Sequence, residues 1–377
     1  MLLLRNAEVF TGGRFVAADL TIAGELVHAI GGPPPPDADV VDLAGCRLVP
    51  GFVDLHFHGA MGADVMDDDP AGLARICDYQ ARHGTTAFLA TTITADMPAL
   101  LAAVERIATA AAAPGAGARV VGLHIEGPFI NPAQRGCHRV DWMKSPSLAD
   151  HDALSAHAAG APLHFTVAPE LPGAAEFIRG VVARGSTVSL GHSDARAAEV
   201  RRGLDAGAGI FTHLFNAMRG LHHREPGVVG AALDSPAHVE LICDGVHVAP
   251  EVVKLVYQLK GPGRLVLVTD AMAAAGMGDG TYRFAGERVT VTGGVARTDA
   301  GALASSTITL RDALANLMRF TGAPLAEALS TVTSTPARVL GMEDRLGAIA
   351  PGRAADLVAL DGDLAIRAVF CRGRRVT

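Results

Sequence analysis

The first fifty residues alternate between apolar and polar positions in short runs. Three such runs are LLLRNAEVF (2–10), ADLTIAGELVHAI (18–30) and DVVDLAGCRLV (39–49), and a GGPPPP break lies at 31–36. A period of two is typical of strands that bury one face, and clusters of Gly and Pro mark turns. The pattern therefore predicts a small all-β unit at the start of the chain.

After Pro50-Gly51 the pattern changes to apolar runs of strand length, each followed by an amphipathic stretch of helical length. Such alternation is typical of parallel strands joined by crossover helices. The predicted strands are 52–58, 86–93, 120–127, 163–169, 187–193, 209–215, 239–247 and 265–271. Eight strands over about 220 residues predict an α/β fold, a closed (β/α)8 TIM barrel. A doubly wound open sheet is the alternative, but no GxGxxG turn follows the first strand to support it.

Strand-like alternation returns towards the end of the chain. TYRFAGERVTVTGGVART (281–298) is predicted to be an inserted hairpin, and helices are expected from there to about residue 341. The last strand-like runs are RLGAIAPGRAADLVALDGD (345–363) and AVFCRGRRVT (368–377). We expect these to pair with the first strands. The predicted domains are a small β-sandwich from residues 1–50 and 342–377, and a catalytic barrel over residues 51–341.

Composition and charge narrow the range of partners. Apolar residues make up 49% of the 377 positions and charged residues 19%, which is sufficient for a large core and argues against disorder. The net charge of the chain is −7, and the 29 arginines and 3 lysines of the chain form no basic run. Nucleic acid is therefore not an expected partner. The most apolar segment, from Ala99, carries Glu105 and Arg106, and we expect a packed helix there and no contact with a membrane.

The five cysteines are scattered and include no CxxC pair. This pattern is typical of reduced thiols in a cytoplasmic protein. The start, MLLLRN, lacks the basic residues and the long apolar run of a secretory signal. We therefore expect a cytoplasmic location.

Ionisable residues lie at or near the carboxyl ends of the predicted barrel strands. The first strand ends in GFVDLHFHGA, where His56 and His58 are two residues apart and so share one face of the strand. Others on later strands are Glu126, His192, His213 and Asp270. Each alone has an ordinary explanation, such as a helix cap or a hydrogen-bonded core histidine. Because strand ends converge at a barrel mouth, together they predict a site for a divalent ion such as zinc.

Short motifs along the whole chain carry a family resemblance. They are the HxH, HIEGPFINP (124–132), GHS (191–193), THLFNAM (212–218), REPG (224–227), CDGVHVAP (243–250), VTDAM (268–272) and APGRAADLVALD (350–361). Together they resemble the N-acetylglucosamine-6-phosphate deacetylases of the amidohydrolase superfamily. The HxH and the closing motif are widespread among amidohydrolases, whereas HIEGPF, THLFNAM and DGVH are more specific to the deacetylases.

The resemblance implies a role for each matching position. Glu126, His192 and His213 match the family's metal ligands. Asp270 matches its catalytic acid/base. His56 and His58 would complete a second metal position, with Glu126 as the bridge. Many amidohydrolases use a carboxylated lysine on the fourth strand instead, but LHFTVAP here contains no lysine. The implied cofactor is one or two divalent ions per subunit, with zinc favoured and Fe, Mn or Co also compatible.

The implied reaction is hydrolysis of the acetamide of N-acetyl-D-glucosamine 6-phosphate to D-glucosamine 6-phosphate and acetate. The resemblance makes His138 the group that polarises the amide carbonyl, and it places substrate contacts at Asn216, Ala217 and His247. Arg224 in HHREPG matches an arginine that binds the phosphate across a subunit interface, which implies a homodimer. Arginine suits phosphate because it donates two parallel hydrogen bonds, although a surface ion pair is the ordinary reading.

Two loops depart from the family pattern. RVDWM (139–143) replaces the usual acidic and prolyl residues, and Leu303-Ala304-Ser305-Ser306 stands where LAGS is common. Cys137, beside His138, is either reactive or simply packed. Two alternative functions stay open: an amidohydrolase acting on another amide or a cyclic amidine, and an inactive metal-containing scaffold. Retention of Asp270 argues against the scaffold.

Overall fold

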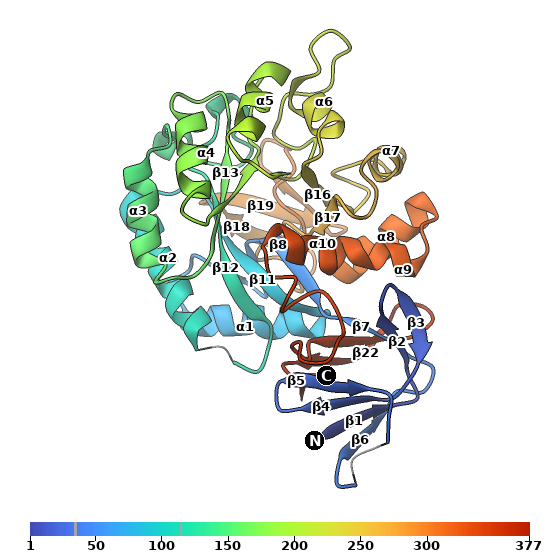
Figure 1. The fold of residues 1–377 in the computed structure, drawn as a ribbon. Helices are drawn as coiled ribbons and strands as arrows, with labels where there is room; N and C mark the ends of the chain where they lie inside the picture. Colours follow the sequence, from blue (N-terminus) through green and yellow to red (C-terminus); the bar gives the residue numbers. More distant parts are fainter. Residues whose placement is uncertain (34–35, 114) are drawn as a thin grey trace.

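The centre of the molecule is a sheet of eight parallel strands (Figure 1). The computed structural model describes residues 1–33, 36–113 and 115–377, so residues 34 and 35 of the predicted GGPPPP break lie outside the described residues. In sheet order the strands are β8 (Phe52–Phe57), β11 (Thr85–Thr92), β12 (Arg119–Glu126), β13 (Leu163–Val167), β14 (Thr187–Leu190), β15 (Ile210–Phe211), β16 (His238–Ile242) and β17 (Leu265–Val268). The predicted (β/α)8 barrel is confirmed.

The barrel closes between β8 and the segment that follows β17. Asp270 N donates to His56 O at 2.8 Å, and His58 N donates to Ala271 O at 2.9 Å. The closing hydrogen bonds therefore place residue 270 directly beside the His56–His58 pair.

Helices cover the outside of the barrel (Figure 1). The longer ones are α1 (Pro70–Arg82), α2 (Met97–Ala112), α3 (Leu148–His157), α4 (Ala174–Val182), α5 (Ala197–Asp205), α6 (Gly227–Asp234), α7 (Pro250–Lys260) and α8 (Leu310–Thr321). Several begin at a side-chain cap: Asp96 accepts from Ala99 N and Thr309 from Asp312 N. On α4 the spacing of Phe177, Ile178 and Val181 buries one face against the sheet.

Both chain ends contribute to a β-sandwich, at the bottom of Figure 1. One sheet has the order β5-β4-β1-β6 and the other β23-β22-β21-β7-β2-β3. Their strands are β1 (Leu2–Arg5), β2 (Glu8–Thr11), β3 (Arg14–Ala17), β4 (Leu20–Ala23), β5 (Leu26–Ile30), β6 (Asp39–Asp42), β7 (Arg47–Pro50), β21 (Leu357–Leu360), β22 (Ile366–Cys371) and β23 (Arg374–Arg375). The antiparallel β7–β21 pair joins the two ends. The exact division of the chain at 50/51 and 341/342 stays a prediction.

A three-stranded antiparallel sheet follows β17, where the sequence pattern predicts a single hairpin. Its strands are β18 (Gly280–Phe284), β19 (Glu287–Thr292) and β20 (Val295–Thr298). The prediction missed the second turn, at Gly293-Gly294, which returns the chain along β19. This insertion brings Phe284 towards the barrel mouth, where its ring centroid lies 5.1 Å from that of His58.

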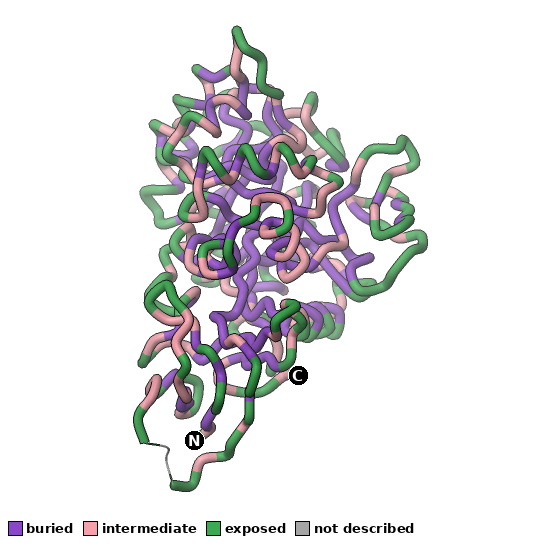
Figure 2. Tube along the Cα trace, turned by 90° about the vertical axis from the view of Figure 1, so that its right-hand side faces the viewer, coloured by how far each residue is buried: buried purple, intermediate pink, exposed green. Residues whose placement is uncertain are grey.

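The remaining elements are short connections and chain segments near the barrel. They are β9 (Gly59–Ala60), β10 (Ala63–Asp64), the 3-10 helices Pro132–Gln134, Val140–Trp142 and Leu329–Val332, and the helices α9 (Leu325–Ala328) and α10 (Ser334–Val339). Buried positions gather inside the barrel in Figure 2, while exposed positions follow the outer helices and loops. Among the described residues, no helix has the length and apolarity to cross a bilayer.

Several predicted strands were too long at their carboxyl ends. The pattern predicts 209–215 and 239–247, but β15 ends at Phe211 and β16 at Ile242. His213 therefore lies beyond its strand, not within it. The error has a physical cause: the residues after these strands are buried because they line the barrel mouth, so their apolar character extends the strand signal past the last ladder hydrogen bond.

Candidate metal centre

A cavity of about 210 Å³ opens at the carboxyl ends of the barrel strands. Its walls come from loops after β8, β12, β14, β15, β16 and β17 and from the β18–β20 insertion. The predicted site residues that line it are His58, Glu126, His138, His192, His213, Asn216, Ala217, His247 and Asp270. Residues more than 200 positions apart are thus neighbours, as expected for a barrel mouth.

Glu126 lies at the centre of this group. Its Oε1 is 3.1 Å from both His192 Nε2 and His213 Nε2 and 3.3 Å from His56 Nε2. Its Oε2 is 3.2 Å from His58 Nε2 and 3.4 Å from His138 Nε2. One buried carboxylate therefore touches five imidazoles.

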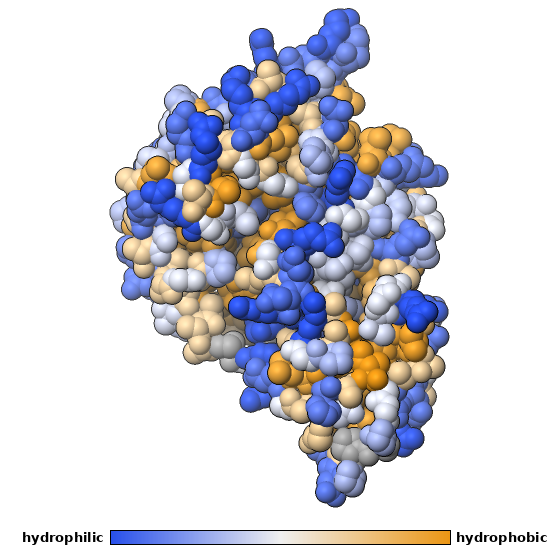
Figure 3. Space-filling model, viewed as in Figure 1, coloured by the Kyte–Doolittle hydropathy of each residue, from blue (hydrophilic) through white to orange (hydrophobic). Residues whose placement is uncertain are grey.

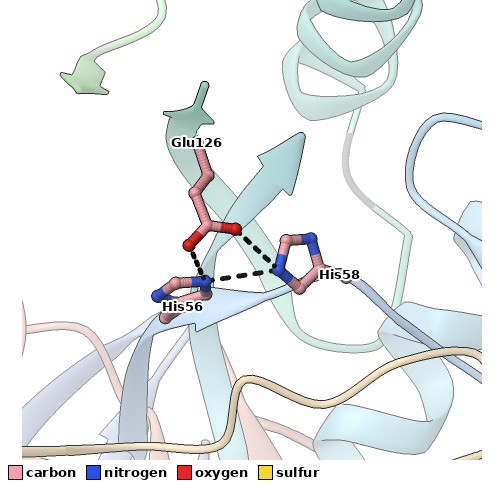
Figure 4. Close-up of side chains that lie close together, drawn as sticks. All are labelled: His56, His58 and Glu126. Atoms are coloured by element: carbon pink, nitrogen blue, oxygen red, sulfur yellow. Dashed lines mark hydrogen bonds and ion pairs between the residues drawn. The ribbon is translucent and has the colours of Figure 1, made fainter. Parts of the chain in front are cut away.

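The first histidine pair faces this carboxylate as the strand alternation predicts. Figure 4 shows the rings of His56, on β8, and His58, directly after it, pointing to the two oxygens of Glu126 at the end of β12. The two Nε2 atoms are 3.3 Å apart. Asp270 Oδ1 completes the group at 3.2 Å from His58 Nε2 and 3.5 Å from His56 Nε2.

The second pair, His192 and His213, differs in that both rings approach the same oxygen of Glu126, Oε1. Their Nε2 atoms are 3.1 Å apart. The donor atoms of Glu126 with either pair all lie within 4.8 Å of one another. For a tetrahedral ion with metal–nitrogen distances of about 2.0–2.1 Å, two nitrogen ligands are roughly 3.3 Å apart. Both pairs therefore have the spacing that such an ion requires.

The outer ring nitrogens decide where the lone pairs point. His58 Nδ1 is 3.0 Å from Thr91 O, and His192 Nδ1 is 2.8 Å from Gln134 O. A carbonyl only accepts, so each Nδ1 carries a hydrogen and each Nε2 is the ring atom that faces Glu126. The metal-free His58 also carries a proton on Nε2, and when a cation displaces that proton the lone pair of Nε2 can bind the cation. The residues present therefore fit a divalent cation.

The pKa values follow from this concentration of charge. Burial alone lowers the pKa of His58, but hydrogen bonds and charges from Asp270 and Glu126 raise it to about 9. Burial likewise raises the pKa of Glu126, yet the charge of His56 and bonds from His138 and His192 hold it well below its ordinary value. For Asp270, burial is outweighed by His56 and His58, which lower its pKa to about 2. The barrel mouth therefore favours the charged forms of His58, Glu126 and Asp270.

His138 differs in its tautomer from His58 and His192. The backbone N–H of Thr94 donates to His138 Nδ1 at 3.3 Å, and the Thr94 hydroxyl lies 2.6 Å from the same atom. Nδ1 must therefore accept, which leaves the hydrogen on Nε2. Burial lowers the pKa of His138 to about 4, so the ring is neutral at pH 7. It presents an N–H donor to the cavity, where a carbonyl oxygen can accept it.

Backbone strain is concentrated at this site. Non-glycine residues with positive φ include His192 (46°), His213 (27°), Ala217 (47°), Asp270 (47°) and Ser305 (62°). Such conformations cost of order 1–3 kcal/mol each and persist where the surroundings enforce them. At Asp270 the enforcing contacts are the closing bond to His56 O and the Ser305 hydroxyl, which donates to Asp270 Oδ1 at 2.9 Å.

Arg224 is the predicted site residue that the structure does not bring to the cavity. It lies in the loop between β15 and α6, which projects at the top of Figure 1. Arg224 is exposed there, its Nη1 is 2.7 Å from His223 Nε2, and the projecting tip is strongly hydrophilic in Figure 3. Within one subunit this arginine belongs to the surface.

Sequence reasoning missed several residues of the site. Phe284 and Gly136 line the cavity, and Glu240 lies beneath it with Oε2 3.2 Å from His56 Nδ1. Phe284 gives no local signal, since a distant insertion delivers it. Glu240 does give one: it is a carboxylate inside VELICDGVH, an otherwise apolar strand.

The two departing loops have distinct positions. Arg139–Met143 encloses a short 3-10 helix in which the Arg139 guanidinium stacks over Trp142, 4.4 Å from the ring centroid. Leu303 and Ser305 instead line the cavity. The Cys137 thiol is buried, and burial raises its pKa to about 12, so it packs as a neutral thiol. All five cysteines are free.

Comparisons with known proteins agree with this geometry. Residues 47–376 match the model of the amidohydrolase family. The chain belongs to the amidohydrolase family. An N-acetylgalactosamine-6-phosphate deacetylase from Escherichia coli O157:H7 is 40% identical over 94% of this chain and 93% of its own. An N-acetylglucosamine-6-phosphate deacetylase from Vibrio furnissii is 38% identical over 90% and 85%.

The three-dimensional structure of the chain is also similar to a solved structure over its whole length. That structure is a mutant N-acetyl-D-glucosamine-6-phosphate deacetylase from Mycobacterium smegmatis in complex with N-acetyl-D-glucosamine-6-phosphate. It is 36% identical, with a TM-score of 0.94 and coverage of 100% of this chain and 99% of that one. The predicted family resemblance is confirmed.

Proposed function

We propose that this amidohydrolase is a metal-dependent deacetylase that hydrolyses N-acetyl-D-glucosamine 6-phosphate to D-glucosamine 6-phosphate and acetate. The observation that carries the proposal is the Glu126-centred cluster, with Asp270 at its edge, in a chain that matches hexosamine-6-phosphate deacetylases over most of its length. A second candidate substrate, N-acetyl-D-galactosamine 6-phosphate, is favoured by the 40% identity to the Escherichia coli relative.

Two sets of side chains would hold the divalent ion or ions. Glu126, His192 and His213 form one set, and Glu126 with His56 and His58 forms the other. The proposed ion is zinc, with occupancy of one or two per subunit, because imidazole and carboxylate ligands suit it. The bound cation would supply Lewis acidity, which makes water acidic enough to ionise near neutral pH and polarises a carbonyl group.

Asp270 would move the proton. Its pKa of about 2 keeps it ionised at pH 7, so it can accept a proton from the attacking water. As the new C–O bond forms, His138 Nε2–H donates to the amide oxygen and stabilises the charge that develops there. Asp270 then passes its proton to the nitrogen while the C–N bond breaks, so that an amine leaves with acetate as the other product.

Asn216, Ala217 and His247 would contact the sugar or its phosphate at the cavity wall. Arg224 of the partner subunit would bind the phosphate in a homodimer, since Arg224 within one subunit is exposed and does not line the cavity. Five free thiols fit the proposed cytoplasmic location.

The proposal is tested by measuring acetate release from both N-acetylhexosamine 6-phosphates and from unphosphorylated N-acetylglucosamine. We expect kcat/KM for the phosphorylated sugar to exceed that for the free sugar at least about 100-fold. Arg224→Gln should remove most of that difference, and Arg311→Gln, a surface control on α8, should not. Acetate release without a phosphate preference would refute the phosphate assignment. A metal-loaded chain that releases no acetate would favour the inactive scaffold, and turnover only on another amide would favour that alternative.

A further inference from the structure

We propose that Glu240, on β16, is a positioning residue that makes the His56–His58 half of the site competent to bind metal. The inference rests on the proposed metal dependence and extends it to a side chain that does not line the cavity. Glu240 is fully buried. A carboxylate inside a barrel strand is costly unless it accepts hydrogen bonds, so its partners indicate why it is there.

One oxygen of Glu240 has two hydrogen-bond partners, and each belongs to a candidate metal ligand: the ring of His56 and the backbone of His213. Oε2 is 3.2 Å from His56 Nδ1 and accepts from the backbone N–H of His213 at 3.1 Å. The backbone bond makes Oε2 an acceptor, so His56 Nδ1 must donate to it. The Nε2 of a neutral His56 is then left with its lone pair, 3.3 Å from Glu126 Oε1. A metal ligand needs that lone pair.

The contrast with the other ligands shows what Glu240 adds. His58 and His192 are oriented by main-chain carbonyls, those of Thr91 and Gln134. His56 is oriented by a carboxylate, which also raises the basicity of the ring it holds. Through His213 N the same oxygen also fixes the backbone of the other half-site. Glu240 therefore couples the two histidine pairs from beneath.

A structural role alone does not account for Glu240. Its Oε1 has no hydrogen-bond partner among the described residues, and neither has His213 Nδ1. A carboxylate with one unsatisfied buried oxygen costs stability. Replacement by an apolar residue leaves His56 Nδ1 and the His213 N–H buried without an acceptor, so it should lower the stability of the metal-free fold as well as weaken metal binding. Recovery of metal binding by a variant that keeps the acceptor oxygen distinguishes a positioning residue from a packing residue.

The test uses the purified full-length chain, stripped of metal and titrated with zinc ions against a chromophoric chelator. Glu240→Leu removes the acceptor, and Glu240→Gln keeps an oxygen that can accept from His56 and from His213 N. We expect Glu240→Leu to weaken zinc binding about 10- to 100-fold, and Glu240→Gln to restore at least half of the loss on a logarithmic scale. The stripped Leu variant should melt at a lower temperature than the wild type, so zinc affinity and its recovery in Glu240→Gln are the readouts that decide.

Glu170→Gln is the matched control. Glu170 is likewise a carboxylate held by hydrogen bonds, three of them, from Asn131, Ser193 and Asp194, but it touches no imidazole. It should lower the melting temperature without changing zinc affinity as much as Glu240→Leu does. Wild-type zinc affinity in Glu240→Leu would overturn the inference. If Glu240→Leu does not fold, the test uses Glu240→Gln. Zinc binding by Glu240→Gln as weak as that of Glu126→Gln would then overturn the inference, because the amide oxygen would not have replaced the carboxylate as acceptor. A wild-type chain that binds no zinc would instead overturn the metal proposal, and this inference with it.

Discussion

Two layers of histidines lie one above the other in the barrel and behave in opposite ways. His56 and His58 face Glu126 at the mouth, whereas His124 and His164 lie deeper, and the His56 and His124 ring centroids are 4.6 Å apart. All four are almost completely buried. Burial lowers the pKa of His124 well below its ordinary value and that of His164 to about 4. Their hydrogen-bond partners are threonine hydroxyls.

In the upper layer burial also lowers the pKa of each histidine, but nearby carboxylates raise it by more. The charges of Glu126 and Asp270 raise the pKa of His56 well above its ordinary value, despite complete burial. The difference comes from direct contacts: His56 and His58 contact the carboxylates of Glu126 and Asp270, whereas the side chains that hydrogen-bond to His124 and His164 are threonines. Histidine in a barrel core is therefore not a sign of a metal site by itself; histidine with a shared carboxylate is.

The largest expected effect comes from making the upper layer resemble the lower one. Glu126→Gln removes the charge that five imidazoles share. We expect zinc to be lost and acetate release to fall by about 10³-fold or more. Metal content by mass spectrometry and initial rates measure both. Stoichiometric zinc with wild-type turnover would contradict the central position given to this carboxylate.

Asp270→Asn separates metal binding from proton transfer. The amide cannot carry the proton from water to the leaving nitrogen, so kcat should fall by about 10²- to 10⁴-fold while zinc content is retained. Ser305→Ala, which removes a hydroxyl that contacts Asp270 O and Oδ1 but leaves the carboxylate in place, is the control and should cost far less. Unchanged turnover in Asp270→Asn would remove Asp270 from the mechanism.

The pH dependence of stability should differ between the layers in protein stripped of metal. The His58 pKa of about 9 lies above the unfolded value of ~6.5. Its contribution is therefore complete below about pH 6.5 and is lost as the pH rises through about 9, by up to about 3 kcal/mol. Denaturant unfolding at pH 6.5 and 9 measures the loss, and Glu126→Gln should flatten it. A free energy of unfolding independent of pH over this interval would be the contrary result.

The smallest effect is expected in the lower layer. His124 Nε2 lies 2.7 Å from the Thr166 hydroxyl, and the ring makes no bond to Glu126. His124→Leu should lower the free energy of unfolding by about 1–3 kcal/mol by leaving buried hydroxyls poorly paired, with zinc content unchanged. Loss of zinc without loss of stability would mean that the two layers are not separate.

The sequence predicts those parts of this molecule that obey a short-range rule. The eight strands follow from apolar periodicity, and the shared face of His56 and His58 follows from a spacing of two. The groups that orient the histidines and line the cavity follow no such rule. Thr91 O and Gln134 O are main-chain atoms that any residue supplies, and Phe284 arrives by the path of an insertion. Such contacts depend on the three-dimensional course of the chain, which periodicity does not encode.

The metal site itself is tested most directly by anomalous diffraction at the zinc edge from crystals grown with zinc. We expect a peak about 2.0–2.2 Å from a carboxylate oxygen of Glu126 and from the Nε2 atoms of His192 and His213. Zinc found only elsewhere on the protein, with these three side chains turned away from one another, would contradict it.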